Sequence, residues 1–200
     1  AIGTYTGPIV VTPVTSSYVV WASNGAKQYY GKFYIYADAT LKKLLLVNEV
    51  DFELYVRGIG EVPSSWPVEA LKAQAVAARS YAYCGYLHPR ESRYHVNADT
   101  SDQVYVGKAK EDGYMGSRWR DAVTVTAKLV LKDRDGKWAK VYYHSTCGGH
   151  TENNEDIWGG TALSYSRGVS CPYCASSPYR AWSRTYTISD LRTRLGKPDL

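Results

Sequence analysis

The sequence has very little phenylalanine or methionine. Its 200 residues include 2 Phe and 1 Met, against 19 Tyr and 6 Trp. Tyr and Trp rings combine a flat apolar face with a hydrogen-bonding edge, and such rings suit the binding of sugars and glycan chains. The same residues are common in β-strands, so ordinary strands explain part of this content equally well.

A run of 18 or more apolar residues is also missing, which excludes a membrane-spanning helix from this sequence. The apolar fraction of 44% is that of a globular protein with a real core. The sequence starts at Ala1 without a charged n-region. We therefore expect a mature or trimmed chain, whose export signal, if it has one, is not in view.

Charges of one sign do not gather in runs. The formal net charge of +5 favours anionic partners. Lys and Arg alternate with acids, however, as in KLVLKDRDGK at 128–137. This pattern argues against a nucleic-acid partner. Internal repeats and low-complexity tracts are absent as well.

The order of predicted elements indicates an α+β fold. Strands and hairpins are expected around Asn24-Gly25 and Asp135-Gly136, because such dipeptides between β-rich runs favour tight turns. One long Ala-rich helix is expected over about 67–87, starting with Pro67 at its first position. Residues 107–115 are expected to be irregular, and a short C-terminal helix follows at ISDLRTRL, capped by Ser189. A β-rich segment, 1–43, is expected to join a catalytic domain at 44–200.

Four cysteines leave three interpretations open. Cys147, His150, Cys171 and Cys174 have the spacing C-x2-H-x20-C-x2-C, which suits tetrahedral zinc. His144 is an alternative nitrogen donor. Disulfides that involve Cys84, or free thiols, are the other two interpretations. The CPYC sequence also matches a glutaredoxin redox motif, but at position 171 it lacks the early strand and following helix that this motif requires.

The stretch GEVPSSWP at 60–67 places a lone acid, Glu61, among apolar neighbours. Desolvation by Val62, Pro63 and Trp66 would favour its protonated form, as a general acid requires. The N-terminus of the helix that follows would act in the opposite direction. A local capping or pairing role is the alternative explanation for this acid.

The longer segment VDFELYVRGIGEVPSSWPVEALKAQAVAARSYAY resembles the signature of the stage II sporulation protein D family, which includes amidase-enhancer proteins. Further matches are DTSDQVYVG, which ends at Gly107, and the segments at 142–160 and 166–174. Together they cover most of the chain from about residue 44 to about residue 182, and runs of this length are far more specific than short motifs.

The resemblance implies a lytic transglycosylase that cleaves peptidoglycan glycan strands, preferably strands without stem peptides. It puts the catalytic acid on Glu61. One carboxyl group suffices: it protonates the glycosidic oxygen and then accepts the proton of the muramic acid C6 hydroxyl, whose internal attack gives a 1,6-anhydro end. Neither water nor a second acid is needed, in contrast to glycoside hydrolysis.

The substrate-binding residues expected beside Glu61 come partly from the helix and partly from the family motifs alone. Gln74 and Tyr81, seven residues apart, share one helix face that could line a groove, although internal hydrogen bonds would explain them equally well. The full set is Trp66, Gln74, Tyr81, Gln103, Tyr105, His144 and Ser145. Arg79 is expected to anchor a buried carbonyl or acid, and structural roles are expected for the remaining acids Glu53, Glu69, Glu152, Glu155 and Asp156.

The chain departs from the family pattern in one respect. Some similar proteins carry a zinc site just before the QVY motif, but here that segment, ESRYHVNADTSDQVY, has no cysteine. Any zinc would then be structural, at the later CGGH and CPYC sequences.

A non-catalytic protein that binds the wall and stimulates an amidase is the alternative function, and a glycan lectin is a third. Glycan strands and a cell-wall amidase are accordingly the expected partners.

Overall fold

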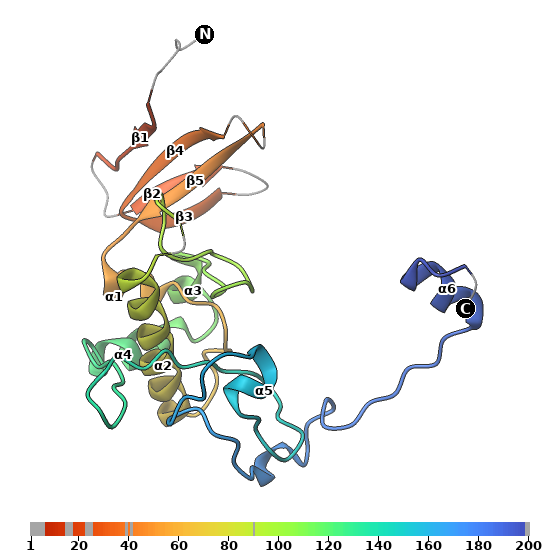
Figure 1. The fold of residues 1–200 in the computed structure, drawn as a ribbon. Coiled ribbons are helices and arrows are strands. Elements are labelled where there is room, and N and C mark those ends of the chain that lie inside the picture. The colour runs from red at the N-terminus through yellow and green to blue at the C-terminus, as the bar shows by residue number, and fades with distance from the viewer. Residues whose placement is uncertain are drawn as a thin grey trace. The chain divides into compact units, whose positions relative to one another are not determined.

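The computed structural model describes residues 7–14, 18–22, 26–38, 40, 42–89 and 91–198, with only the backbone described at 18–22 and 26. The chain folds into two compact units, Ala1–Tyr142 and Tyr143–Leu200 (Figure 1). The boundary expected near residue 43 lies inside the first unit. A single catalytic domain over 44–200 stays a prediction.

The N-terminal part of the first unit is antiparallel sheet, as predicted. Three strands form one sheet in the order β1-β4-β5, and β2 pairs with β3. The strands are β1 (Ile9–Val11), β2 (Tyr18–Ala22), β3 (Ala26–Tyr30), β4 (Lys32–Asp38) and β5 (Lys43–Glu49). Their Val, Ile and Tyr content favours extended backbone. The β2–β3 pairing confirms the antiparallel pair expected around Asn24-Gly25, although the turn itself lies outside the described residues.

The helical part of the first unit contains the core. Its helices are α1 (Phe52–Arg57), α2 (Val68–Leu87), α3 (Ala109–Asp112) and α4 (Gly116–Val125). Helices α2 and α4 pack along each other (Figure 1). Ala75 and Ala78 of α2 are fully buried in one cluster with Trp119 of α4. Small side chains on α2 thus permit close helix packing.

Several local predictions need correction. Pro67 is the N-cap of α2 rather than its first helical residue. The segment 107–115, expected to be irregular, contains α3. The hairpin expected around Asp135-Gly136 is reduced to a turn with the isolated bridge Lys132↔Trp138. The first residues of its upstream arm, Thr124 and Val125, belong to α4 instead of a strand. Trp119, Ala122 and Val123 are buried on α4, and this packing outweighs the strand preference of its Thr and Val residues.

The second unit contains α5 (Asn154–Trp158), the 3₁₀ turn η1 (Pro172–Cys174) and α6 (Ile188–Leu195). The predicted C-terminal helix is confirmed, but its cap is Thr187 rather than Ser189. The Thr187 hydroxyl accepts from the Asp190 N–H, and the Asp190 carboxylate accepts from the Thr187 N–H, which makes a capping box.

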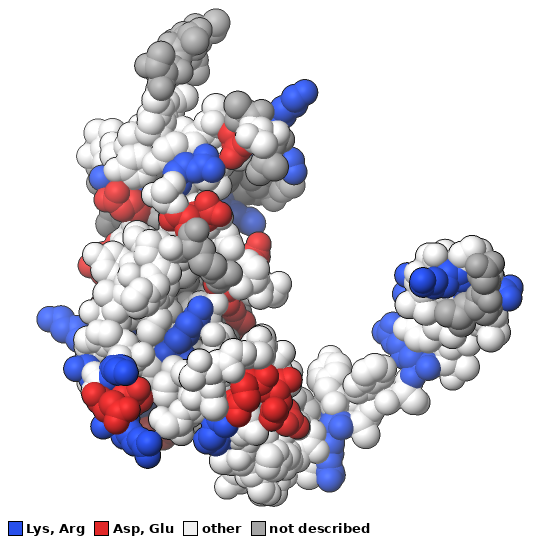
Figure 2. Space-filling model, in the orientation of Figure 1, with Lys and Arg blue, Asp and Glu red and all other residues white. Residues whose placement is uncertain are grey.

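Strands precede helices along the chain, so the α+β class is confirmed. Among the helices in the described residues, none combines the length and apolar character that crossing a bilayer requires. On the face of the first unit seen in Figure 2, acidic and basic groups lie beside one another rather than in a basic stripe.

Candidate active site around Glu61

The backbone before Glu61 is held by a short antiparallel ladder. The Gly60 N–H donates to the Val104 carbonyl at 2.8 Å, and the Val106 N–H donates to the Gly58 carbonyl at 2.8 Å. Ile59 and Tyr105 form the bridge between these bonds. The GEVP and QVY segments, which are far apart in the sequence, are therefore fixed side by side.

The carboxyl group of Glu61 is half-buried and asymmetric in its contacts. Its Oε1 accepts the Val104 backbone N–H at 2.7 Å. Within the part of the chain that the structure describes, Oε2 makes no hydrogen bond, and no Lys or Arg nitrogen lies within 4.0 Å of the carboxyl group. Three buried side-chain atoms in that part of the chain lack a hydrogen-bond partner, namely Arg57 Nε, Gln74 Nε2 and Glu111 Oε1. Oε2 of Glu61 also lacks a partner but is not one of these buried atoms, so it is in contact with solvent.

A half-buried lysine lies near this acid without pairing with it. The Lys110 ammonium donates to the carbonyl of Val62 and lies 5.3 Å from the centre of the Trp119 ring. Desolvation lowers the pKa of Lys110 from its ordinary value. Val62 is buried, whereas Pro63 and Trp66, the other two apolar neighbours named from the sequence, are exposed.

Trp66 is an exposed member of the expected binding set in the first unit. It lies in the loop between Glu61 and α2 and is 43% exposed, and its neighbour Val68 is 44% exposed. The loop is held by two contacts, from the Trp66 N–H to the Pro63 carbonyl and from Arg118 to the Ser65 carbonyl. An exposed indole on a fixed loop can stack on a sugar ring.

Three other expected binding residues make internal hydrogen bonds. Gln103 is fully buried, donating to the Ala78 carbonyl and accepting from the Tyr55 hydroxyl. The Tyr105 hydroxyl donates to Asn48, and burial raises the pKa of Tyr105 well above its ordinary value. The Tyr81 hydroxyl donates to Asp102 at 2.7 Å. The Gln103 and Tyr81 bonds hold the ladder segment against α2, whereas the Tyr105 bond reaches β5. Direct substrate contact by these three residues stays a prediction.

Gln74 is the other expected binding residue on α2, besides Tyr81, and its environment differs. Its side chain is 9% exposed, and Nε2 has no partner among the described residues. His144 and Ser145 belong to the second unit, where both are exposed. Their expected role in binding likewise stays a prediction.

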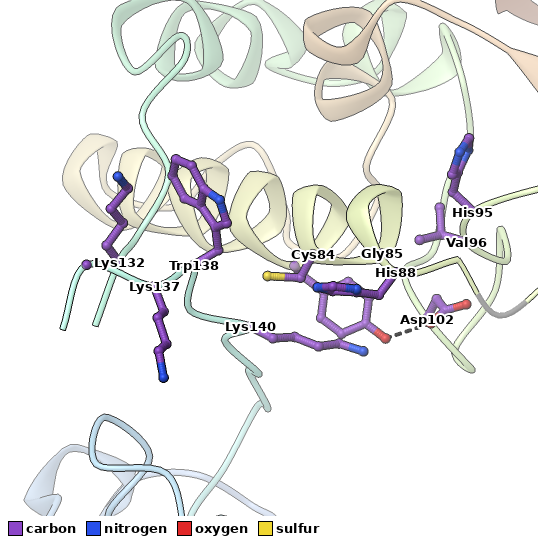
Figure 3. A pocket seen from close by; sticks show the side chains of 12 residues that line it. Cys84, Gly85, His88, His95, Val96, Asp102, Lys132, Lys137, Trp138 and Lys140 are labelled. Carbon is purple, nitrogen blue, oxygen red and sulfur yellow. Dashed lines mark hydrogen bonds between the residues drawn. The ribbon is translucent and has the colours of Figure 1, made fainter. Parts of the chain in front are cut away.

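A cavity of about 690 Å³ opens at the C-terminal half of α2 (Figure 3). Cys84 of α2 and the C-cap residue His88 line it together with Trp138 and Lys140, and the Lys140 side chain extends toward Asp102. Asp102 is two residues from Val104, a distance of about 7 Å along extended chain. Glu61 is not in the lining, but its hydrogen-bond partner is thus close to the cavity.

The cavity lining is aromatic and basic. Lys132, Lys137 and Lys140 line it against a single acid, Asp102. The Lys132 ammonium lies 4.2 Å from the Trp138 ring centre and that of Lys140 lies 4.6 Å from the Tyr81 ring centre. Sequence reasoning missed this cavity, because the K-W-A-K sequence of 137–140 gave no signal beyond strand preference.

Among the acids named as alternatives, three have basic partners. Glu53 binds Arg79 through two hydrogen bonds of 3.0 and 2.9 Å, which confirms that Arg79 anchors an acid. Glu69 pairs with Lys72 at the surface. Glu155 pairs with Arg167 in the second unit. Glu61 differs from these three in having no basic partner among the described residues, since its printed hydrogen bond comes from a backbone N–H.

The Glu155–Arg167 pair predicts a pH dependence for the second unit. Hydrogen bonds from Arg167 hold the pKa of Glu155 at about 2, below its ordinary 4.5. A group whose pKa is lower in the folded state contributes stability above pH 4.5, and the contribution disappears as the pH falls toward 2. We expect the difference in unfolding temperature between wild type and Glu155→Gln to shrink over this range. A difference that is constant with pH would contradict the assignment.

The four cysteines are free thiols in the structure. Burial raises the pKa of Cys84, which lies in the first unit on α2. The sulfur atoms of Cys147, Cys171 and Cys174 lie within 4.8 Å of one another in the second unit, and this group includes no histidine among the described residues. The ring of the fourth expected ligand, His150, lies close to Gly168.

Comparison with known proteins identifies the family. Residues 40–132 match the family model described as Stage II sporulation protein. An uncharacterized protein of Brachyspira hyodysenteriae is 36% identical over 173 residues, which are 84% of this chain and 44% of the relative. Stage II sporulation protein D of Bacillus subtilis is 30% identical over 165 residues, 75% of this chain and 47% of the relative.

A further relative is the protein named Amidase enhancer in Bacillus subtilis. It is 32% identical over 139 residues, which are 67% of this chain and 17% of the relative. The chain thus spans less than half the length of these three relatives. Through residues 40–132, which include Glu61 and Val104, the chain belongs to the stage II sporulation protein D family.

Proposed function

We propose that the chain is a lytic transglycosylase of peptidoglycan, with Glu61 as its single acid and base. The observation that carries the proposal is the asymmetry of the Glu61 carboxyl group. The Val104 N–H fixes Oε1, while Oε2 is open to solvent and has no partner among the described residues. A catalytic acid needs this combination of fixed orientation and one accessible oxygen.

The reaction requires two proton transfers at the same carboxyl group. Glu61 first donates its proton to the glycosidic oxygen between N-acetylmuramic acid and N-acetylglucosamine as the C1–O bond breaks. The carboxylate then accepts the proton of the muramic acid C6 hydroxyl, whose oxygen forms a new bond to C1. The products are a 1,6-anhydro end and a free sugar hydroxyl, and Glu61 is protonated again. The Val104 N–H would hold the carboxyl group through both steps.

The surroundings of Glu61 support a glycan as the substrate. Trp66 offers an exposed ring for sugar stacking, and the cavity near Asp102 adds Trp138 and three lysines. Strands without stem peptides carry free lactyl carboxylates, which a basic aromatic lining would favour. We infer an extracytoplasmic site of action, since peptidoglycan lies outside the cytoplasmic membrane and one relative is named for sporulation.

A second candidate is a wall-binding protein that enhances an amidase, since one relative carries the name Amidase enhancer. Such a protein would bind glycan through the same aromatic groups but would release no product. In that case a cell-wall amidase would be the partner.

Incubation of the purified protein with peptide-free glycan strands, followed by mass spectrometry, separates these candidates. A lytic transglycosylase releases fragments with anhydro ends, each lighter by one water than the corresponding hydrolysis product. Fragments with reducing ends would indicate a hydrolase and contradict the proposal. Binding of strands without any fragment, together with stimulation of an added amidase, would favour the enhancer.

A further inference from the structure

The second unit gathers three thiols that the proposed chemistry does not use. The sulfurs of Cys147, Cys171 and Cys174 lie within 4.8 Å of one another, and those of Cys147 and Cys174 are 3.3 Å apart. All three side chains are partly buried. Four-coordinate zinc has Zn–S bonds of about 2.3 Å, which correspond to S–S separations of about 3.8 Å. The observed cluster is close to that spacing.

The backbone brings these sulfurs together from two segments. The Cys171 N–H donates to the Gly149 carbonyl at 2.9 Å, and the Thr151 N–H donates to the Val169 carbonyl at 2.9 Å. These bonds align the CGGH segment antiparallel to the segment that leads into CPYC. Gly148, at φ +73°, permits the turn after Cys147, a conformation in which other residues are strained. The 3₁₀ turn η1 then places Cys174 one turn after Cys171.

A backbone donor also points at the cluster. The Cys147 N–H lies 3.4 Å from the Cys174 sulfur, within hydrogen-bonding distance for sulfur. Such N–H groups stabilise the negative charge of a thiolate, which is the form that binds metal. Three thiolates this close would repel one another, and a divalent cation removes that repulsion.

The unit needs a stabilising element besides apolar packing. Among its described residues, Asn154 alone is buried, and no hydrophobic side chain is. A unit of about 60 residues rarely folds stably on so small a core, and natural proteins of this size add disulfides or a structural metal. This observation is independent of the cysteine spacing.

We propose that Cys147, Cys171 and Cys174 bind one Zn²⁺ ion as three thiolates and that this ion stabilises the second unit. The site differs from the set expected from spacing, because His150 is not a necessary ligand. The His150 ring lies near Gly168, and its nitrogens are not part of the group around the sulfurs. Zinc binding displaces the three thiol protons to solvent and involves no oxidation or reduction.

The test measures metal in the intact protein, purified without chelator. We expect one zinc per chain by elemental analysis and by native mass spectrometry, with cobalt substitution giving sulfur-to-metal charge-transfer absorption. Cys171→Ser and Cys174→Ser should each lose the metal. His150→Ala should retain it, and Cys84→Ser, a buried cysteine of the first unit, is the matched control that should also retain it.

A second measurement covers variants that fold poorly. Chelation of zinc from the wild-type protein should make residues 143–198 sensitive to protease, and added zinc should restore resistance. A metal-free protein whose mass is lower by two hydrogens would indicate a disulfide and overturn the proposal. A metal-free protein with three alkylatable thiols in this unit would overturn it too. Neither measurement uses glycan, so failure here is distinguishable from failure of the proposed transglycosylase.

Discussion

Replacement of Glu61 by Gln is expected to lower the release of anhydro fragments by about 10²- to 10⁴-fold. The amide has the shape of the carboxyl group, and its oxygen can still accept the Val104 N–H, which now binds Oε1 at 2.7 Å. It cannot donate a proton to the glycosidic oxygen and later take one from the C6 hydroxyl. Glycan binding should change little, so the loss should appear in kcat rather than in KM.

Glu69→Gln is the matched control for this experiment. Glu69 lies in the first turn of α2, a few residues after Glu61, and pairs with Lys72 at the surface. Exposed pairs of this kind contribute little to stability, so this variant should keep both fold and activity. Wild-type rates of fragment release from Glu61→Gln would contradict the catalytic assignment. Equal losses in both variants would point to a general effect of charge on glycan binding.

Local sequence patterns predicted the elements that carry a clear local signal. The Ala-rich periodicity predicted α2, and the Asn24-Gly25 pair predicted the antiparallel strands β2 and β3. The same reasoning failed at α4, since Thr124 and Val125 favour strands and only packing of Trp119 against α2 explains the helix. Such packing depends on residues far away in the chain.

The candidate site was predictable in its residue types but not in its geometry. The GEVP motif indicated Glu61, yet its hydrogen-bond partner Val104 is 43 residues away, and its contact is a backbone N–H that no side-chain pattern reveals. The same holds for Arg79, since its position on an Ala-rich helix indicated a buried partner without naming Glu53. The cysteine spacing correctly grouped three thiols, whereas the His150 ring lies close to Gly168 and is not part of that group.

Arg79→Met is expected to destabilise the first unit by about 3 kcal/mol, the lower end for removing one partner from a buried ion pair, because the Glu53 side chain is 27% exposed. Arg79 is 1% exposed. Its guanidinium binds both carboxylate oxygens of Glu53 and the carbonyls of Val123 and Leu129, each at 3.2 Å. Loss of the guanidinium leaves the Glu53 carboxylate and the end of α4 without these donors. Urea denaturation followed by Trp fluorescence would measure the change in the free energy of unfolding.

The controls for this variant come from the same chain. Arg134 is exposed, and Arg134→Met should change the free energy of unfolding by less than about 0.5 kcal/mol. Glu53→Leu combined with Arg79→Met should be more stable than Arg79→Met alone, because the double variant leaves no unpaired carboxylate. If Arg79→Met proved as mild as Arg134→Met, the buried pair would not hold α1, α2 and α4 together. Since α1 leads into the ladder that orients Glu61, fragment release should fall along with stability, and it should recover in part in the double variant.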